Sequence, residues 1–110
     1  MSCTTVGTPM DILRAVSPEG AKIYLDHRAA TMDNPALQAV PLKYKLLIGI
    51  GVAASLQSST CTIMWTKQAR QAGATDAEIV EAILVARLMK MATVNDTAAD
   101  ALAWLKQVEK

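Results

Sequence analysis

Thiol and imidazole groups are the side chains of this sequence best suited to redox and acid–base chemistry, and there are few of them. The chain has two cysteines, Cys3 and Cys61, and one histidine, His27. Two cysteines so far apart cannot build a disulfide framework, and no histidine stands near them at the spacing of a zinc site. We therefore expect no metal ion and no other cofactor, and we interpret Cys3 as a free terminal thiol.

Cys61 is the stronger catalytic candidate because it stands at the start of a predicted helix. Ser58-Ser59-Thr60 supplies capping residues just before it, so unpaired backbone N–H groups and the helix macrodipole favour a thiolate there. The apolar neighbours Ile63, Met64 and Trp65 oppose that effect, because they exclude the water that a charged sulfur needs. The two effects balance, and the sequence favours Cys61 as a buried small hydrophobic residue over Cys61 as a reactive thiol.

The other titratable side chains give weaker indications of a site. Asp26, His27 and Arg28 are adjacent, so a helix directs them to different sides and they form no relay among themselves. Glu78 and Glu81 lie one turn apart, as paired carboxylates would, but a helix capping box accounts for Glu78. We interpret His27 as a structural residue and the two glutamates as part of a solvated face.

The elements that would position these residues are helices, because no alternating pattern is long enough to predict a strand. Capping residues and prolines mark where helices begin, while Asp33-Asn34-Pro35 and Gly73 mark where two of them end. Six helices are predicted: from Pro9 to about Val16, from Pro18 to about Asp33, from Pro41 through the apolar stretch 46–54, from Ser58 to Gly73, from Thr75 through Met89, and from about Asp96 onward.

Two of these helices carry apolar residues on more than one side. Residues 46–54 of the third helix are apolar all round, so we expect that helix to be buried. Gly49 and Gly51 lower its helix propensity, which indicates that they permit the close approach of a neighbouring helix. In the fifth helix, one apolar stripe can serve the core and another a subunit interface.

Length and composition limit the classes of protein to consider. The 110 residues suit one domain, 1–110, and 52% hydrophobic against 19% charged residues is more apolar surface than a small monomer hides, so we predict a homo-oligomer. A net charge of +1 without a basic stripe predicts no nucleic-acid partner.

The opening residues lack the features of a secretory signal, and the run Leu46 to Leu56 is too short to span a bilayer. We therefore expect a cytoplasmic protein with no membrane partner.

Two stretches of the sequence resemble a known helical family. The run Leu47-Ile48-Gly49-Ile50-Gly51-Val52-Ala53-Ala54 is similar to the helix before the redox motif of the alkyl hydroperoxidase D / carboxymuconolactone decarboxylase family. The phrase Ala69 to Ile79, which contains Ala72-Gly73-Ala74-Thr75, resembles the corner that follows that motif. The resemblance covers Pro41 to about Leu105, and it implies an all-α domain that assembles as a trimer or a hexamer.

The resemblance also assigns four positions to the family's motif, E-x11-C-x-x-C-x-x-x-H. Cys61 matches the second cysteine, whereas Ser58 replaces the first. Leu46 stands at the glutamate and Trp65 at the histidine. In the family, one sulfur attacks a peroxide, the other resolves the sulfenic acid as a disulfide, and the histidine and glutamate relay protons. Ser58, Leu46 and Trp65 can supply none of these steps.

Three functions stay open after this comparison. The favoured one is a degenerate, non-redox family member, a homo-oligomer that binds a small apolar or planar molecule. The second is a one-cysteine thiol peroxidase or disulfide-exchange enzyme that uses Cys61, with an external thiol or Cys3 of a neighbouring chain as the resolving partner. The third is a purely structural oligomer, while carboxymuconolactone decarboxylation rests on the family name alone. In the favoured function the ligand-binding residues are Leu46, Ser58, Met64 and Trp65.

Overall fold

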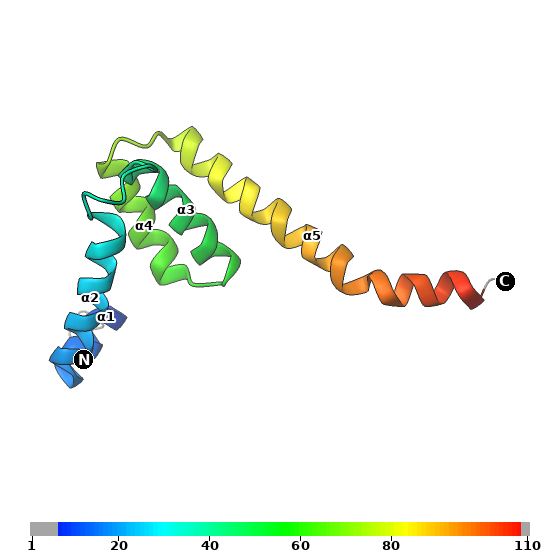
Figure 1. The fold of residues 1–110 in the computed structure, drawn as a ribbon, viewed down its shortest axis with the longest axis horizontal. Helices are drawn as coiled ribbons and strands as arrows, with labels where there is room; N and C mark the ends of the chain where they lie inside the picture. The colour runs from blue at the N-terminus through cyan, green and yellow to red at the C-terminus, as the bar shows by residue number, and fades with distance from the viewer. Residues whose placement is uncertain (1–6, 109–110) are drawn as a thin grey trace. The chain divides into compact units, whose positions relative to one another are not determined.

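The computed structural model of the protein describes residues 7–108, and every regular element in that range is a helix (Figure 1). The all-α fold class is therefore confirmed. Two compact units divide between Lys45 and Leu46. The helices are α1 (Pro9–Val16), α2 (Pro18–Met32), α3 (Leu42–Ser55), α4 (Ser59–Gln71) and α5 (Asp76–Val108).

In the first unit, α1 and α2 each begin at a hydroxyl cap that the sequence predicted. The Thr8 hydroxyl accepts a hydrogen bond from the Asp11 N–H at 3.2 Å, and the Asp11 carboxylate accepts one from the Thr8 N–H at 3.1 Å. The hydrogen bond from the Thr8 backbone holds the pKa of Asp11 below its ordinary value. Ser17 caps α2 by accepting a hydrogen bond from the Gly20 N–H at 3.0 Å. The capping box of Thr8 and Asp11 therefore fixes the start of α1, and the single cap of Ser17 fixes the start of α2.

In the second unit, α3 contributes a narrow buried stripe. Leu46, Ile50 and Ala53 recur at intervals of four and three residues, so they lie on one side of the helix, and all three are buried. Ile48 and Val52 on the other side are 59% and 53% exposed. The prediction of a helix buried all round is therefore wrong for the single chain, because the described elements cover only one face of α3.

Both α3 glycines stand where another helix comes close, as predicted. A side-chain carbon built at Gly51 would lie 3.6 Å from the Cβ of Ala86 and 3.7 Å from the carbonyl oxygen of Ala82, so α5 crosses α3 at this point. A side-chain carbon at Gly49 would meet the ring of Trp65 on α4. Gly51 thus lets α3 approach the backbone of α5, and Gly49 lets the Trp65 ring of α4 lie against the backbone of α3.

The turn between α4 and α5 contains the glycine that ends α4 and the capping box that begins α5, as the sequence predicted. Gly73 adopts a φ of 97°, a backbone region that favours glycine. Thr75 and Glu78 form the predicted capping box: the Glu78 carboxylate accepts from the Thr75 N–H at 2.8 Å, and the Thr75 hydroxyl accepts from the Glu78 N–H at 3.1 Å. An ion pair between Arg70 and Asp76 also joins the two helices.

The predicted fifth and sixth helices are one element, so the described residues hold five helices instead of six. α5 runs unbroken for 33 residues, from Asp76 to Val108. Asn95 and Asp96 resemble a helix start, but the segment contains no proline or glycine that would end the preceding turn. The alanine-rich residues 97–103 that follow are good helix formers, so the helix continues through Asp96.

Removal of the Thr75 cap should destabilise the protein. We expect Thr75→Ala to lower the free energy of unfolding by about 1 kcal/mol, because the Glu78 N–H loses its acceptor at the start of α5. Urea unfolding monitored by circular dichroism measures the change. Thr97→Ala, at an exposed threonine in the body of the same helix, is the matched control and should cost nothing; equal losses in the two variants would contradict the capping role.

Candidate functional site

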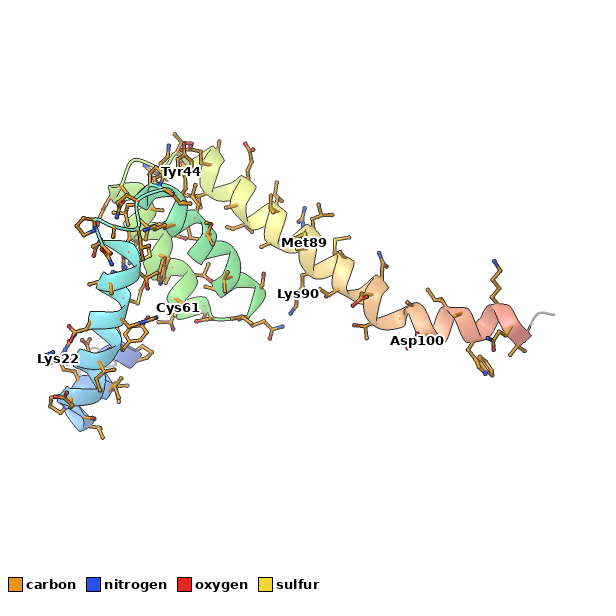
Figure 2. All side chains as sticks on the ribbon, viewed as in Figure 1. Lys22, Tyr44, Cys61, Met89, Lys90 and Asp100 are labelled. Carbon is orange, nitrogen blue, oxygen red and sulfur yellow. The ribbon has the colours of Figure 1, made fainter. Side chains whose placement is uncertain are left out.

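The first turn of α4 places Ser58 and Cys61 side by side. Ser58 is the N-cap, with φ −97° and ψ 93°, and its Oγ accepts a hydrogen bond from the backbone N–H of Cys61 at 3.3 Å. Cys61 is a free cysteine with an exposed side chain (Figure 2). The prediction of a buried Cys61 is therefore wrong, because no described element covers the first turn of α4, where Ser59 and Thr60 are also exposed.

Trp65 follows Cys61 by one helical turn and packs on the backbone of α3. A side-chain carbon built at Gly49 would lie 2.4 Å from Cε3 and 2.6 Å from Cζ3 of Trp65, closer than real atoms approach. The indole therefore occupies the space that a side chain at Gly49 would fill. Trp65 is half-buried in this position, and it offers one N–H donor and no basic group.

Leu46 and Met64 complete the set of predicted site residues. Leu46 is 2% exposed and belongs to the buried stripe of α3, one turn before Gly49. Met64 is half-buried on α4, next to Trp65 in the sequence. Four of the five predicted residues, Ser58, Cys61, Met64 and Trp65, thus share the beginning of α4, while Leu46 comes from α3. None of the five carries a carboxylate or an imidazole, so these positions provide no proton relay.

A hollow of about 470 Å³ opens beside the start of α4. Of the predicted site residues, only Ser58 lines it. The hydroxyls of Thr62 and Thr66 donate to the carbonyl oxygens of Ser58 and Thr62, each at 2.7 Å. Those hydroxyls are thereby satisfied within the helix, so the hollow is largely apolar. Its lining residues are Ala54, Gln57, Ser58, Ser59, Thr62, Ile63 and Thr66.

The turn before Ser58 shapes this hollow. Gln57 adopts a φ of 62°, the left-handed region that a residue with a side chain enters at a cost of about 1–2 kcal/mol. The Ser58 N–H donates to the carbonyl oxygen of Ala53 at 2.9 Å, which closes the end of α3. Sequence reasoning missed Gln57, Thr62 and Thr66; the only local signal was the spacing of the two threonines, one turn apart.

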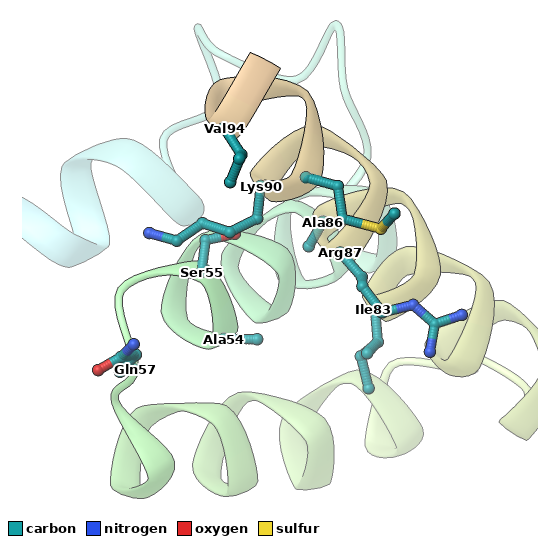
Figure 3. A pocket seen from close by; sticks show the side chains of 9 residues that line it. Ala54, Ser55, Gln57, Ile83, Ala86, Arg87, Lys90 and Val94 are labelled. Atoms are coloured by element: carbon teal, nitrogen blue, oxygen red, sulfur yellow. The ribbon is translucent and has the colours of Figure 1, made fainter. Parts of the chain in front are cut away.

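A second cavity, of about 350 Å³, lies between the end of α3 and the middle of α5 (Figure 3). Arg87 and Lys90 stand one helical turn apart in its wall, and the remaining lining is mainly aliphatic. None of the five predicted site residues lines it. Its lining residues are Ala54, Ser55, Gln57, Ile83, Ala86, Arg87, Lys90, Met91 and Val94.

The remaining titratable groups form no further constellation in the described chain. His27 is exposed on α2, in the first unit. Within residues 7–108, no group of three histidine, cysteine, aspartate or glutamate side chains is placed to hold a metal ion. No helix in this range is both long enough and apolar enough to cross a membrane. Cys3 lies outside the described residues.

Comparison with known proteins identifies a family. A model of the carboxymuconolactone decarboxylase family matches residues 18–107. The match therefore includes all of α2, α3 and α4 and all of α5 except Val108. No curated protein and no solved structure matches the chain.

The contact of Trp65 with Gly49 can be tested with the two glycines of α3. We expect Gly49→Ala to lower the free energy of unfolding by about 1–3 kcal/mol, because the new methyl group displaces the indole. Gly51→Ala is the matched control: its methyl group meets Ala86 at an ordinary contact distance, and the higher helix propensity of alanine should make it neutral or stabilising by up to about 1 kcal/mol. Urea unfolding reports both; a Gly49→Ala protein as stable as Gly51→Ala would contradict the packing.

Proposed function

Because the chain belongs to the carboxymuconolactone decarboxylase family, we propose that it is a family member without the redox motif, a non-redox homo-oligomer that binds a small molecule. The packing of Trp65 against Gly49 is the observation that carries this proposal. At the position where the resemblance puts a basic histidine, an indole is part of the packing between α3 and α4. A residue held in that way contributes to stability and not to proton transfer.

The other motif positions support the loss of peroxide chemistry. Leu46, at the position of the glutamate, is buried among apolar residues of α3 and exchanges no proton. Ser58, at the position of the first cysteine, uses its hydroxyl oxygen to cap α4. A hydroxyl cannot form a disulfide with Cys61, so an oxidised Cys61 has no resolving partner at that position.

The proposed ligand is small and mainly apolar or planar. Of the predicted ligand-binding residues, Ser58 lines the hollow at the start of α4, while Ala54 and Ile63 give the hollow apolar walls. Gln57 and Ser59 add polar side chains at that hollow, which suit a few orienting hydrogen bonds to a ligand. A volume of about 470 Å³ is within the range that binds small organic molecules.

The apolar surface left on the chain supports the oligomeric part of the proposal. Ile48 and Val52 are more than half exposed on α3, and the large apolar residues of α5 beyond Ile79 are exposed as well. Soluble monomers seldom carry apolar patches of this extent. A trimer or a hexamer, the assemblies implied by the resemblance, would cover them.

One observation favours a second candidate, a one-cysteine thiol enzyme. The Cys61 side chain is exposed in the first turn of α4, where a peroxide can reach it. Its sulfur would attack one peroxide oxygen and become a sulfenic acid, while the O–O bond breaks and the other oxygen leaves, protonated, as water or an alcohol. One external thiol would then form a mixed disulfide and release water, and a second would restore Cys61 and leave as a disulfide.

The rate of Cys61 oxidation separates the two candidates. We expect hydrogen peroxide to oxidise Cys61 no faster than a free cysteine across the pH range, because no base or resolving thiol stands at the motif positions. Mass spectrometry of intact protein measures the rate, and Cys61→Ser shows how much oxidation occurs elsewhere. Fast oxidation with repeated turnover in excess small thiol would contradict the non-redox function and establish the second candidate.

Binding of an anionic dye with an aromatic, apolar body tests the ligand site. We expect 8-anilinonaphthalene-1-sulfonate to bind the oligomer, and Ile63→Glu to weaken binding about tenfold, because it puts a carboxylate into the wall of the hollow. Gln71→Glu adds the same charge at an exposed position on α4 that does not line the hollow, and should leave binding unchanged. Dye fluorescence gives both affinities. Equal affinities with an intact oligomer would contradict this ligand site and favour a purely structural oligomer.

A further inference from the structure

The cavity between the end of α3 and the middle of α5 has aliphatic walls and two basic side chains, and the proposed function does not use it. It shares only Ala54 and Gln57 with the hollow at the start of α4. Ile83, Met91 and Val94 in its wall are each more than a third exposed. A hydrocarbon group in the cavity would remove part of this apolar surface from water, which favours binding.

The polar groups of the cavity favour an anion as the other part of the ligand. The Ser55 hydroxyl donates to the carbonyl oxygen of Gly51 at 2.8 Å, so its proton is used within α3. Within residues 7–108, the side chains of Arg87 and Lys90 make no ion pair and no hydrogen bond. Figure 3 shows them leaving α5 in different directions, with their charged groups on two sides of the cavity. Both charges are therefore available to a ligand.

No acidic side chain of residues 46–108 stands where it would neutralise these charges. α3 and α4 contain no aspartate and no glutamate. The acidic residues in the first turn of α5 are engaged in its capping box and in the ion pair to α4. Glu81 and Asp96 lie on the side of α5 opposite the cavity, because of the 3.6-residue period of the helix. Asp100 lies about 15 Å along the helix beyond Lys90.

The end of α3 does not use the two charges either. Carbonyl oxygens at the end of a helix attract cations. Those of Ala53 and Ala54 accept hydrogen bonds from the backbone N–H groups of Ser58 and Gln57, at 2.9 Å and 3.1 Å. Neither basic side chain donates to this end of the helix. An anion in the cavity would therefore meet two cations that have no other partner within the described chain.

We propose that this cavity binds an aliphatic carboxylate, a small molecule with a negatively charged head and a hydrocarbon tail. Arg87 and Lys90 bind the head, to which a guanidinium can donate two parallel hydrogen bonds. The tail lies against Ile83, Met91 and Val94. The volume of about 350 Å³ is near the lower end of the range of small-molecule sites, which suits a tail of medium length. The site is separate from the ligand site of the proposed function and does not depend on it.

Octanoate is the probe for this site, and octanol and acetate are its controls. In the full-length chain with methyl-labelled methionine, the NMR signal of Met91 reports on the cavity, and that of Met10 reports on the first unit. We expect octanoate to shift the Met91 signal, assigned with Met91→Leu, and to leave Met10 unchanged. Octanol lacks the charge and acetate lacks the tail, so each should bind at least about tenfold more weakly.

A matched pair of double variants tests the two cations. Arg87→Gln/Lys90→Gln removes both charges from the cavity and should weaken octanoate binding about tenfold. Lys67→Gln/Lys106→Gln removes the same net charge from exposed positions that line neither cavity, and it should leave binding unchanged. Circular dichroism verifies that both proteins fold.

Four results would overturn the proposal. One is the absence of a Met91 shift with octanoate, and another is octanol binding as tightly as octanoate. Equal affinities of the two double variants would mean that Arg87 and Lys90 do not bind the carboxylate. Weaker octanoate binding in Ile63→Glu, but not in Arg87→Gln/Lys90→Gln, would place octanoate in the hollow at the start of α4, because Ile63 lines only that hollow. That last result would leave the ligand site of the proposed function standing.

Discussion

The close contact between α3 and α4 is the constraint on which the candidate site depends. Gly49 lacks the side chain that would hold the two helices apart, and the indole of Trp65 fills that space. The contact orients α4, and with it Ser58 and Cys61 in the first turn. Leu46 lies one turn before Gly49 in the buried stripe of α3. Three of the four positions assigned to the redox motif are therefore tied into packing or capping, and Cys61 alone faces outward.

Local chemistry made most of the helix boundaries predictable. Thr8, Ser17 and Thr75 are caps whose hydrogen bonds involve residues three positions away, so sequence alone identifies them. Gly73 marks the corner after α4 through its own backbone conformation. The continuation of α5 through Asp96 was not predictable, because a possible cap does not start a new helix unless the preceding turn ends.

The sequence predicted which residues lie together in the candidate site, but not which of their side chains are exposed. The resemblance identified Ser58, Cys61 and Trp65 as neighbours, and the helical spacing of α4 agrees. The exposure of Cys61 depends on which elements cover the first turn of α4, and nothing in its flanking residues encodes that. The hollow beside Ser58 was missed because Thr62 looks polar in the sequence, whereas its hydroxyl bonds to the backbone one turn earlier.

Under the proposed non-redox function, the residues at two of the motif positions serve packing instead of catalysis. A glutamate and a histidine between α3 and α4 must keep ionisable groups close to an apolar core, which costs stability unless they are paired. Leu46 and Trp65 remove that cost, since one is buried and the other packs on Gly49. Active-site residues often oppose stability, so under the proposed function Leu46 and Trp65 are free to be selected for packing alone. Both residues pack in the second unit, whose exposed apolar side chains are concentrated on the outer face of α3 and along α5.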